Sequence, residues 1–342
     1  MNTLPAPRPR VALPGIAPVS WEHPADRAAL QALRALPGVD QVIRKVLAIL
    51  GGERGIRLLF QGNAVRCGPT QFPRLWGMHL ENCTTFGWEK IPELYVTQTP
   101  IFNAGAYGVD DPFIVIHSSA FELLDEDEQR GLLAHELGHV ISGHALYTTI
   151  AAILALVSLG VLPLPLELIA LPVRLAFLEW SRKSELSADR AEVLGSQDLS
   201  ASMRMFMKMA GGANTANVRP GDLNLEPFMQ QASEYATNHE GFDVIYKLLN
   251  TLVVTHPMHV VRAGEVQRWV QSGAYDRILN GEYVRRGTSE ADERPLRDDM
   301  REAAAHYKEE FTEFADNLKS AAKRATDRAR DKFNDARAKG AV

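Results

Sequence analysis

The chain has 342 residues, of which 46% are hydrophobic and 23% are charged, and its formal net charge is −5. This composition is ordinary for a globular protein with a sizeable core, and the slightly acidic balance argues against a nucleic-acid partner. The two cysteines, Cys67 and Cys83, exclude a disulfide framework and indicate free thiols in a reducing compartment.

Residues 1–24 are typical of a flexible arm, because proline occurs at positions 5, 7, 9, 14, 18 and 24. The arm contains no uninterrupted apolar stretch, so we expect no secretory signal peptide and a cytoplasmic location. Helical patterns follow over residues 25–35 and 39–50, with Pro37 and Gly38 between them.

Three short apolar runs, at residues 57–60, 93–98 and 113–117, predict β-strands. Downstream of these runs the pattern is helical almost throughout. We therefore predict an α+β fold that is mostly helical, with a small sheet beside the helical body.

The most informative motif follows the third run, where His135, Glu136 and His139 spell HExxH. Asp125 and Glu128 have the spacing of a capping box, so a helix is expected to begin there. Residues i and i+4 lie on one face of a helix, where two imidazoles can supply two of the three protein ligands of a catalytic zinc. Glu136 then lies beside the open coordination position, as a general base for a water molecule.

A second pair of residues at the same spacing, Glu185 and Asp189, lies in the segment SELSADRAEVLG. A glutamate on a second helix can be the third protein ligand, and a carboxylate one turn later can accept a hydrogen bond from a zinc-binding histidine. Alone, this pair is typical of a solvated helix face. Together with HExxH, it predicts one Zn²⁺ per chain, held by His135, His139 and Glu185, with His144 outside the ligand set.

HELGH followed by SELSAD resembles the gluzincin zinc peptidases related to HtpX and to the CAAX prenyl endopeptidases. Residues 92–108, 112–124 and 255–262 resemble other elements of that family, so the resemblance runs from about residue 25 to about residue 270. It implies a zinc metalloendopeptidase domain over residues 25–288. Such a domain would hydrolyse peptide or unfolded-protein substrates, with protein quality control as one setting.

The resemblance also implies residues that contact the substrate. In the family the substrate lies along an edge strand, and Asn103 and Ala104 fall where that strand ends. His256 would donate a hydrogen bond to the developing oxyanion, a contact worth a few kcal/mol. Plainer interpretations are that Asn103 belongs to an ordinary turn and that His256 lies at the surface before a proline. Arg262 either pairs with an acidic residue near the metal or is solvated.

Residues 146–180 predict a hairpin of two apolar helices. The stretch from Tyr147 to Leu166 carries no charged side chain and is long enough to span a bilayer. A single span would, however, place the two ligand motifs on opposite sides of a membrane. The return arm, from Leu168 to Leu178, is too short for a second span. The hairpin is therefore either buried against the domain or in peripheral contact with the inner membrane face.

Residues 289–342 predict a charged helix with a heptad-like apolar stripe, which either stays solvated, pairs with another copy or contacts an anionic membrane. Two other functions remain open for the whole chain. A chaperone-like or membrane-associated binding module would use zinc only for structure, although Glu136 has no purpose there. A zinc aminopeptidase would need an acidic cluster that captures the free α-amine, and the sequence shows none.

Overall fold

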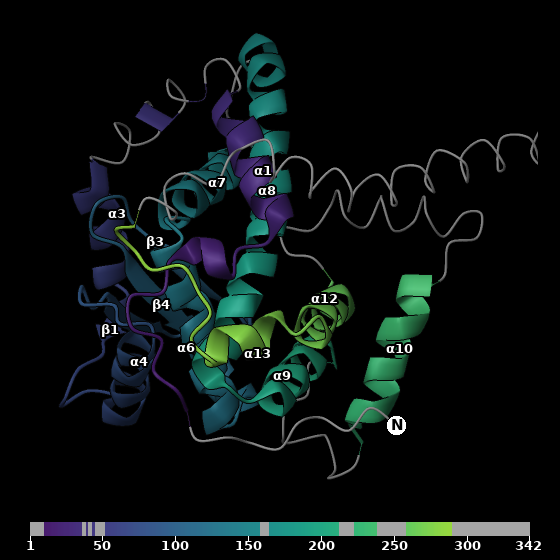
Figure 1. Cartoon of the computed structure of the whole chain (residues 1–342). Coiled ribbons are helices and arrows are strands. Elements are labelled where there is room, and N and C mark those ends of the chain that lie inside the picture. The colour runs from purple at the N-terminus through teal and green to yellow at the C-terminus, as the bar shows by residue number, and fades with distance from the viewer. Residues whose placement is uncertain are drawn as a thin grey trace, which may run out of the picture.

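The computed structural model describes residues 10–35, 39, 43–44, 52–157, 164–211, 222–237 and 258–288, and within these the side chains of residues 52–53, 59 and 152–175 are not described. The fold is α+β and mostly helical, which confirms the predicted class (Figure 1). The predicted helix over residues 39–50 lies largely outside this description, and the predicted C-terminal helix over residues 289–342 lies entirely outside it.

Four short strands form one mixed sheet in the order β1-β2-β4-β3. Strand β2 (Glu93–Thr97) lies parallel to β4 (Phe113–His117), while β1 (Ala64–Arg66) and β3 (Ala104–Tyr107) pair antiparallel at the two edges. Side chains alternate across β4, so that Ile114 faces one core and Phe113 the other. The edge position of β3 is the feature that matters for the site.

The predicted strand at residues 57–60 is wrong, because these residues belong to helix α3 (Gly52–Gln61). Ile56 and Phe60 lie one helical turn apart, and both pack on the sheet face that carries Phe113. A short run such as Arg57 to Phe60, with three apolar residues, fits a strand and a buried helix equally well, and here the helical spacing of Ile56 and Phe60 decides.

The other helices lie on the opposite side of the sheet, where α5 and α6 contact β4, and they extend away from it (Figure 1). In chain order they are α1 (Pro24–Ala35), α4 (Pro73–Thr85), α5 (Ser119–Leu123), α6 (Glu126–Ile141), α7 (Ala145–Val157), α8 (Leu164–Ser196), α9 (Leu199–Gly211), α10 (Leu225–Thr237), α12 (His259–Gln271) and α13 (Ala274–Leu279), with a 3₁₀ turn at Pro18–Ser20.

Helix α6 begins at the predicted capping box. The Asp125 side chain accepts hydrogen bonds from the backbone N–H groups of Asp127 and Glu128, and the Glu128 side chain accepts one from the Asp125 N–H. These bonds satisfy backbone donors that a helix leaves unpaired at its start. The helix is then free to run through the middle of the core, where nearly all of its last three turns are buried.

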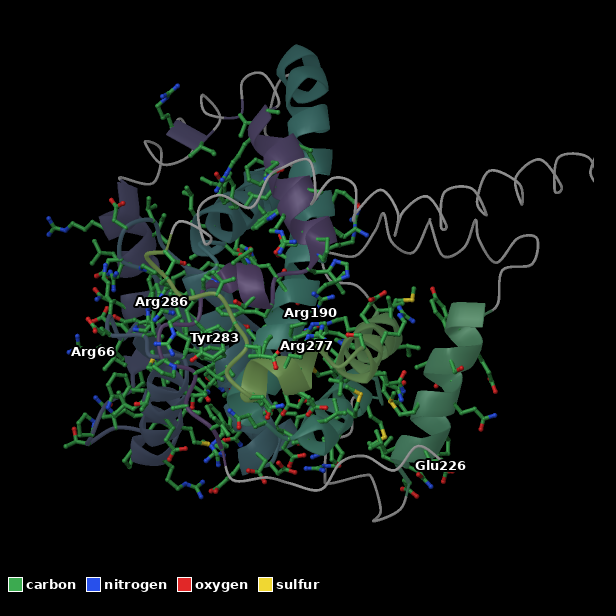
Figure 2. The ribbon with its side chains drawn as sticks, in the orientation of Figure 1. Arg66, Arg190, Glu226, Arg277, Tyr283 and Arg286 are labelled. Atoms are coloured by element: carbon green, nitrogen blue, oxygen red, sulfur yellow. The ribbon has the colours of Figure 1, made fainter. Side chains whose placement is uncertain are left out.

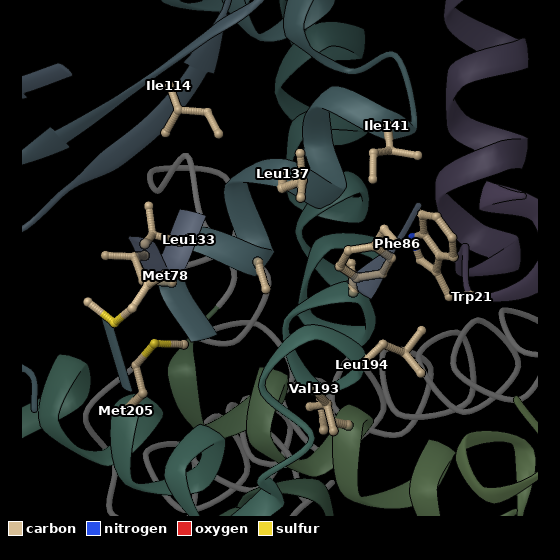
Figure 3. Close-up of a cluster of buried hydrophobic side chains, with 14 of the residues drawn as sticks. Trp21, Met78, Phe86, Ile114, Leu133, Leu137, Ile141, Val193, Leu194 and Met205 are labelled. Carbon is tan, nitrogen blue, oxygen red and sulfur yellow. The ribbon is translucent and has the colours of Figure 1, made fainter. Parts of the chain in front are cut away.

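Helices α6 and α8 pack unusually closely. A β-carbon added at Gly138 of α6 would lie 2.5 Å from the Ala191 β-carbon of α8, and one added at Gly195 of α8 would collide with Ala134 of α6. Glycines on both helices therefore let the two backbones approach. Leu133, Leu137 and Ile141 of α6 and Val193 and Leu194 of α8 belong to the surrounding apolar core (Figure 3).

The N-terminal segment differs from the predicted flexible arm over residues 10–24. Leu13, Ile16 and Trp21 are fully buried, and the Ala17 N–H donates to the Val284 carbonyl. The side chain of Arg286, in the last described loop, donates to the Ile16 carbonyl (Figure 2). The segment is rich in proline, but its apolar side chains join the core cluster that contains Cys83 of α4 and Phe86.

Helices α7 and α8 form the predicted hairpin, and its base is packed against α1. Leu33 of α1 lies in one buried cluster with Tyr147, Phe177 and Trp180, and Figure 1 shows α1 and α7 beside the outer half of α8. The return arm does not end at Leu178, because α8 continues as one helix to Ser196. Within the described ranges, no helix has both the length and the apolar character that a membrane crossing requires.

Candidate metal centre

Three side chains from α6 and α8 converge on one point. His135 Nε2 lies 3.5 Å from Glu185 Oε2, and His139 Nε2 lies 3.4 Å from Glu185 Oε1. All three residues are only 4–5% exposed, and they form a group whose ligand atoms lie within 4.8 Å of one another. Metal–ligand bonds of about 2.0–2.2 Å in a tetrahedron place neighbouring ligand atoms about 3.3–3.6 Å apart, so this donor set fits a zinc-sized cation.

The two histidines differ in the pKa of their rings. Burial lowers the pKa of His139 to about 4, which keeps its ring neutral as a ligand must be. Burial acts the same way on His135, but Asp189 and Glu185 outweigh it and raise the pKa of His135 to about 10. The two carboxylates therefore favour positive charge at this position, whether it is a proton or a metal cation.

Asp189 lies behind His135, as the spacing predicts. Its Oδ1 is 3.1 Å from His135 Nδ1, on the side of the ring away from Glu185. Arg262 of α12 donates to both carboxylate oxygens of Asp189, from Nη2 at 2.6 Å and from Nε at 2.9 Å. Burial by itself raises the pKa of Asp189, but Arg262 outweighs it and holds this pKa below its usual range.

Arg262 therefore pairs with acidic residues near the metal group rather than with solvent. It is 3% exposed, and its Nη1 also lies 3.4 Å from Glu185 Oε2. The guanidinium thus joins α12 to two carboxylates of α8, one on each side of His135. A planar, permanently charged group suits this task because it contacts both oxygens of a carboxylate at once.

Glu136 is buried next to the histidines and outside the group of three. Its carboxylate lies close enough to β3 to act on Tyr107, whose pKa rises to about 12 through burial first and the charge of Glu136 second. Tyr107 stacks on Phe60. The sequence analysis did not single out Tyr107, because only the folded sheet brings the end of β3 to Glu136.

The predicted substrate residues lie at the start of β3 and not at its end. Asn103 Oδ1 accepts a hydrogen bond from the Ala104 N–H, and the Asn103 carbonyl accepts one from the His117 N–H. Ala104 is the first residue of β3, and in the described part of the chain this strand pairs with β4 alone. His256 lies outside the described residues.

His139 also has a partner that the sequence did not predict. Its Nδ1 lies 3.0 Å from His144 Nδ1, and His144 Nε2 lies 3.1 Å from Asp26 Oδ2 on α1. Burial opposes a proton on His144, but Asp26 outweighs it and raises the pKa of His144. No local spacing could reveal this contact, because Asp26 is far upstream in the chain.

Comparison with known proteins places this arrangement in a family. The model of peptidase family M48 matches residues 77–270, which is more than half of the chain. The chain belongs to peptidase family M48. The matched region contains both ligand motifs, so the M48 chain is a protease and its His/His/Glu group is a candidate metal site of a metallopeptidase. The resemblance stated from the sequence is thereby confirmed.

Relatives of this M48 peptidase carry metallopeptidase and protease names. The chloroplastic plastoglobule-localized metallopeptidase 48 of Arabidopsis thaliana is 33% identical over 266 residues, covering 76% of this chain and 74% of the relative. A protease HtpX homolog of Tropheryma whipplei is 31% identical over 104 residues, covering 28% of this chain and 35% of the relative. The chain thus spans about a third of that HtpX homolog. No solved structure matches the chain.

Proposed function

We propose that this M48 chain is a zinc-dependent endopeptidase that holds one Zn²⁺ with His135, His139 and Glu185. The donor set carries the proposal: two imidazole nitrogens, 3.5 Å and 3.4 Å from the carboxylate oxygens of Glu185, beside a second carboxylate that is not part of the set. Two nitrogen donors and one oxygen donor suit zinc better than magnesium or calcium, which prefer oxygen donors. Zinc bound there would supply Lewis acidity to the carbonyl of a peptide and to a water molecule.

Within this proposal, Glu136 is the general base. It takes a proton from the attacking water and passes it to the leaving amine, so no covalent intermediate with the chain is required. Asp189 holds the His135 ring in the orientation that leaves Nε2 facing Glu185. Arg262 holds Asp189 in turn, and the stack of contacts keeps the ligand geometry fixed while the substrate reacts.

Strand β3 supports peptide binding in an extended conformation. It is an edge strand of the described sheet, and an added peptide strand can pair with the main chain of such an edge. Asn103 and Ala104 start this edge and Tyr107 ends it close to Glu136. A peptide along β3 would therefore pass the general base and continue beyond it, as an endopeptidase requires. We retain His256 as the proposed oxyanion donor.

The decisive experiment replaces the general base. Glu136→Gln should bind zinc like the parent yet lose cleavage of an unfolded substrate such as casein by a factor of a thousand or more, on the order of what several kcal/mol of lost catalysis implies. Asp127→Asn, an exposed change on the same helix, is the matched control and should retain activity. Casein cleavage by Glu136→Gln at the parental rate would refute the mechanism.

The ligand assignment has a separate test. Glu185→Gln removes a direct ligand, whereas Asp189→Asn alters only a partner of His135, so zinc affinity should fall further in the first variant. Competition with a chromophoric chelator measures both affinities. Equal zinc affinity in Glu185→Gln and the parent would remove Glu185 from the ligand set.

Two outcomes would favour the alternative functions, a binding module and an aminopeptidase. Zinc bound at one per chain, with no cleavage of any of many substrates, would favour a binding module with a structural metal. Cleavage that stops when the peptide N-terminus is acetylated would favour an aminopeptidase. An endopeptidase cleaves the acetylated peptide internally, and mass spectrometry of the products identifies the bond.

We further propose a cytoplasmic protein with peripheral membrane contact through residues 146–180, and self-association through residues 289–342. The uncharged stretch from Tyr147 to Leu166 and the heptad-like spacing near the C-terminus support these two contacts. Cell fractionation tests the first, since a peripheral protein is released by carbonate or high salt. Sedimentation of the full chain, compared with a chain ending at residue 288, tests the second.

A further inference from the structure

A buried chain of polar side chains leads from the metal group to the N-terminal helix. It begins at His139 Nδ1, which lies 3.0 Å from His144 Nδ1, and continues from His144 Nε2 to Asp26 Oδ2 at 3.1 Å. Asp26 Oδ2 also accepts a hydrogen bond from the Ser187 hydroxyl at 2.6 Å. The Ser187 oxygen accepts one from the backbone N–H of His23 at 2.9 Å.

Every side chain in this path is shielded from water. His144 is 1% exposed, and Asp26 and Ser187 are equally enclosed. The His144 ring also packs edge-on against Trp180, with ring centroids 5.5 Å apart. Buried polar groups without hydrogen bonds are costly, so the contacts along this path fix the orientations of the rings.

The proton positions along the path follow from the metal ligand. If His139 binds a metal through Nε2, its one ring proton is on Nδ1, and that N–H must donate to His144 Nδ1. His144 Nδ1 is then an acceptor, so His144 is neutral in the metal-bound chain although Asp26 raises its pKa, and its one proton is on Nε2, where it faces the Asp26 carboxylate. The opposite arrangement would put a proton on His139 Nε2 and block the metal.

We propose that His144 and Asp26 are positioning residues for the metal ligand His139, selecting the tautomer and the ring orientation in which Nε2 faces Glu185. Asp26 acts through His144, and neither residue touches the substrate or the reacting atoms. His135 and His139 would then each have an outer carboxylate, Asp189 directly and Asp26 through one imidazole. Asp26 of α1, which the sequence analysis did not single out, is thus part of the proposed metal centre.

The inference rests on the proposed metal site and makes a graded prediction. His144→Leu removes the acceptor and should lower zinc affinity by about ten- to a hundredfold, as loss of such outer contacts usually does. His144→Asn places an amide oxygen near the former Nδ1 and should recover most of that loss. The zinc affinity of Asp26→Asn should lie between those of the parent and His144→Leu, because a neutral amide oxygen can still accept a hydrogen bond from His144 Nε2.

Two measurements separate positioning from general damage. In the zinc-loaded parent, long-range proton–nitrogen NMR spectra of labelled histidine should show the His139 proton on Nδ1 in a hydrogen bond, and in His144→Leu this N–H should lose its acceptor and shift. His79→Leu is the matched control, because His79 is equally buried but contacts the Pro92 carbonyl. It should lose stability without changing zinc affinity by more than about twofold, within the spread expected for unrelated sites.

The outcomes are distinct for the two proposals. Parental zinc affinity and an unchanged His139 Nδ1–H resonance in His144→Leu would overturn the positioning role while leaving the metal site intact. The same holds if His144→Asn binds zinc as weakly as His144→Leu, because the acceptor would then be irrelevant. A parent chain that binds no zinc would overturn both proposals.

Discussion

The close approach of α6 and α8 predicts that one added methyl group will disturb both stability and metal binding. In Gly138→Ala, the new β-carbon would lie 2.5 Å from the Ala191 β-carbon. Two carbon atoms in contact prefer about 3.5–4.0 Å, so the helices must separate locally by about 1 Å or more. Gly138 precedes the ligand His139 in the chain, so this separation also moves His139 away from Glu185.

The sign of the change in unfolding free energy shows whether core overpacking or helix propensity dominates in Gly138→Ala. Replacing glycine by alanine inside a helix favours the helix by about 1 kcal/mol, whereas overpacking a core costs about 1–3 kcal/mol. We expect a net loss in unfolding free energy for Gly138→Ala. Gly77→Ala on α4 is the matched control, since its added β-carbon meets nothing within 4 Å and should leave the protein unchanged or more stable.

Urea unfolding in chelator and zinc competition measure the two effects separately. We expect zinc affinity of Gly138→Ala to fall by about tenfold or more, similar to the loss of an outer contact. The double variant Gly138→Ala with Ala191→Gly removes the opposing methyl group and should recover both quantities in a double-mutant cycle. A Gly138→Ala protein as stable as Gly77→Ala, with parental zinc affinity, would refute the reasoning.

Three further outcomes follow from buried groups. Burial raises the pKa of Glu192 to about 8, so the folded state keeps a proton that the unfolded chain releases. The free energy of unfolding should therefore decrease as the pH rises from about 4.5 to about 8. Glu192→Gln should make this decrease smaller in urea titrations with chelator, and a variant with the parental pH profile would contradict the prediction. Arg262→Leu removes the guanidinium that Asp189 and Glu185 share and should cost about 3–5 kcal/mol of unfolding free energy in chelator, with a smaller loss when zinc is present; equal losses in both conditions would count against a cation between them. Trp21→Ala should cost about 3–5 kcal/mol, whereas a loose N-terminal arm predicts almost none in thermal unfolding.

The three residues of the candidate metal site could be predicted from the sequence because their geometry is local. His135 and His139, and likewise Glu185 and Asp189, are each one helical turn apart, so the α-helix alone places each pair on one face. The capping box at Asp125 is local in the same sense. The structure therefore changed little in these assignments and added the distances that make three ligand atoms a single group.

The remaining features depend on contacts between distant parts of the chain. The partners of Arg262 are on α8, and the partner of His144 is on α1, so neither pairing leaves a periodic pattern in the sequence. The burial of Leu13, Ile16 and Trp21 is concealed by the neighbouring prolines, and the short run at residues 57–60 fits two periodicities. In each case packing against another element decides, and packing is not encoded in a short window.

Helix α8 is one continuous element from the apolar hairpin to the metal group and beyond it. At 1.5 Å per residue its 33 residues extend about 50 Å, with Glu185 about 30 Å from the outer end. Its contact with α1 lies near Phe177 and Trp180, about 20 Å from the outer end and about 10 Å from Glu185 on the same scale. The hairpin and the carboxylate of Glu185 therefore belong to the same helix, with the α1 contact between them.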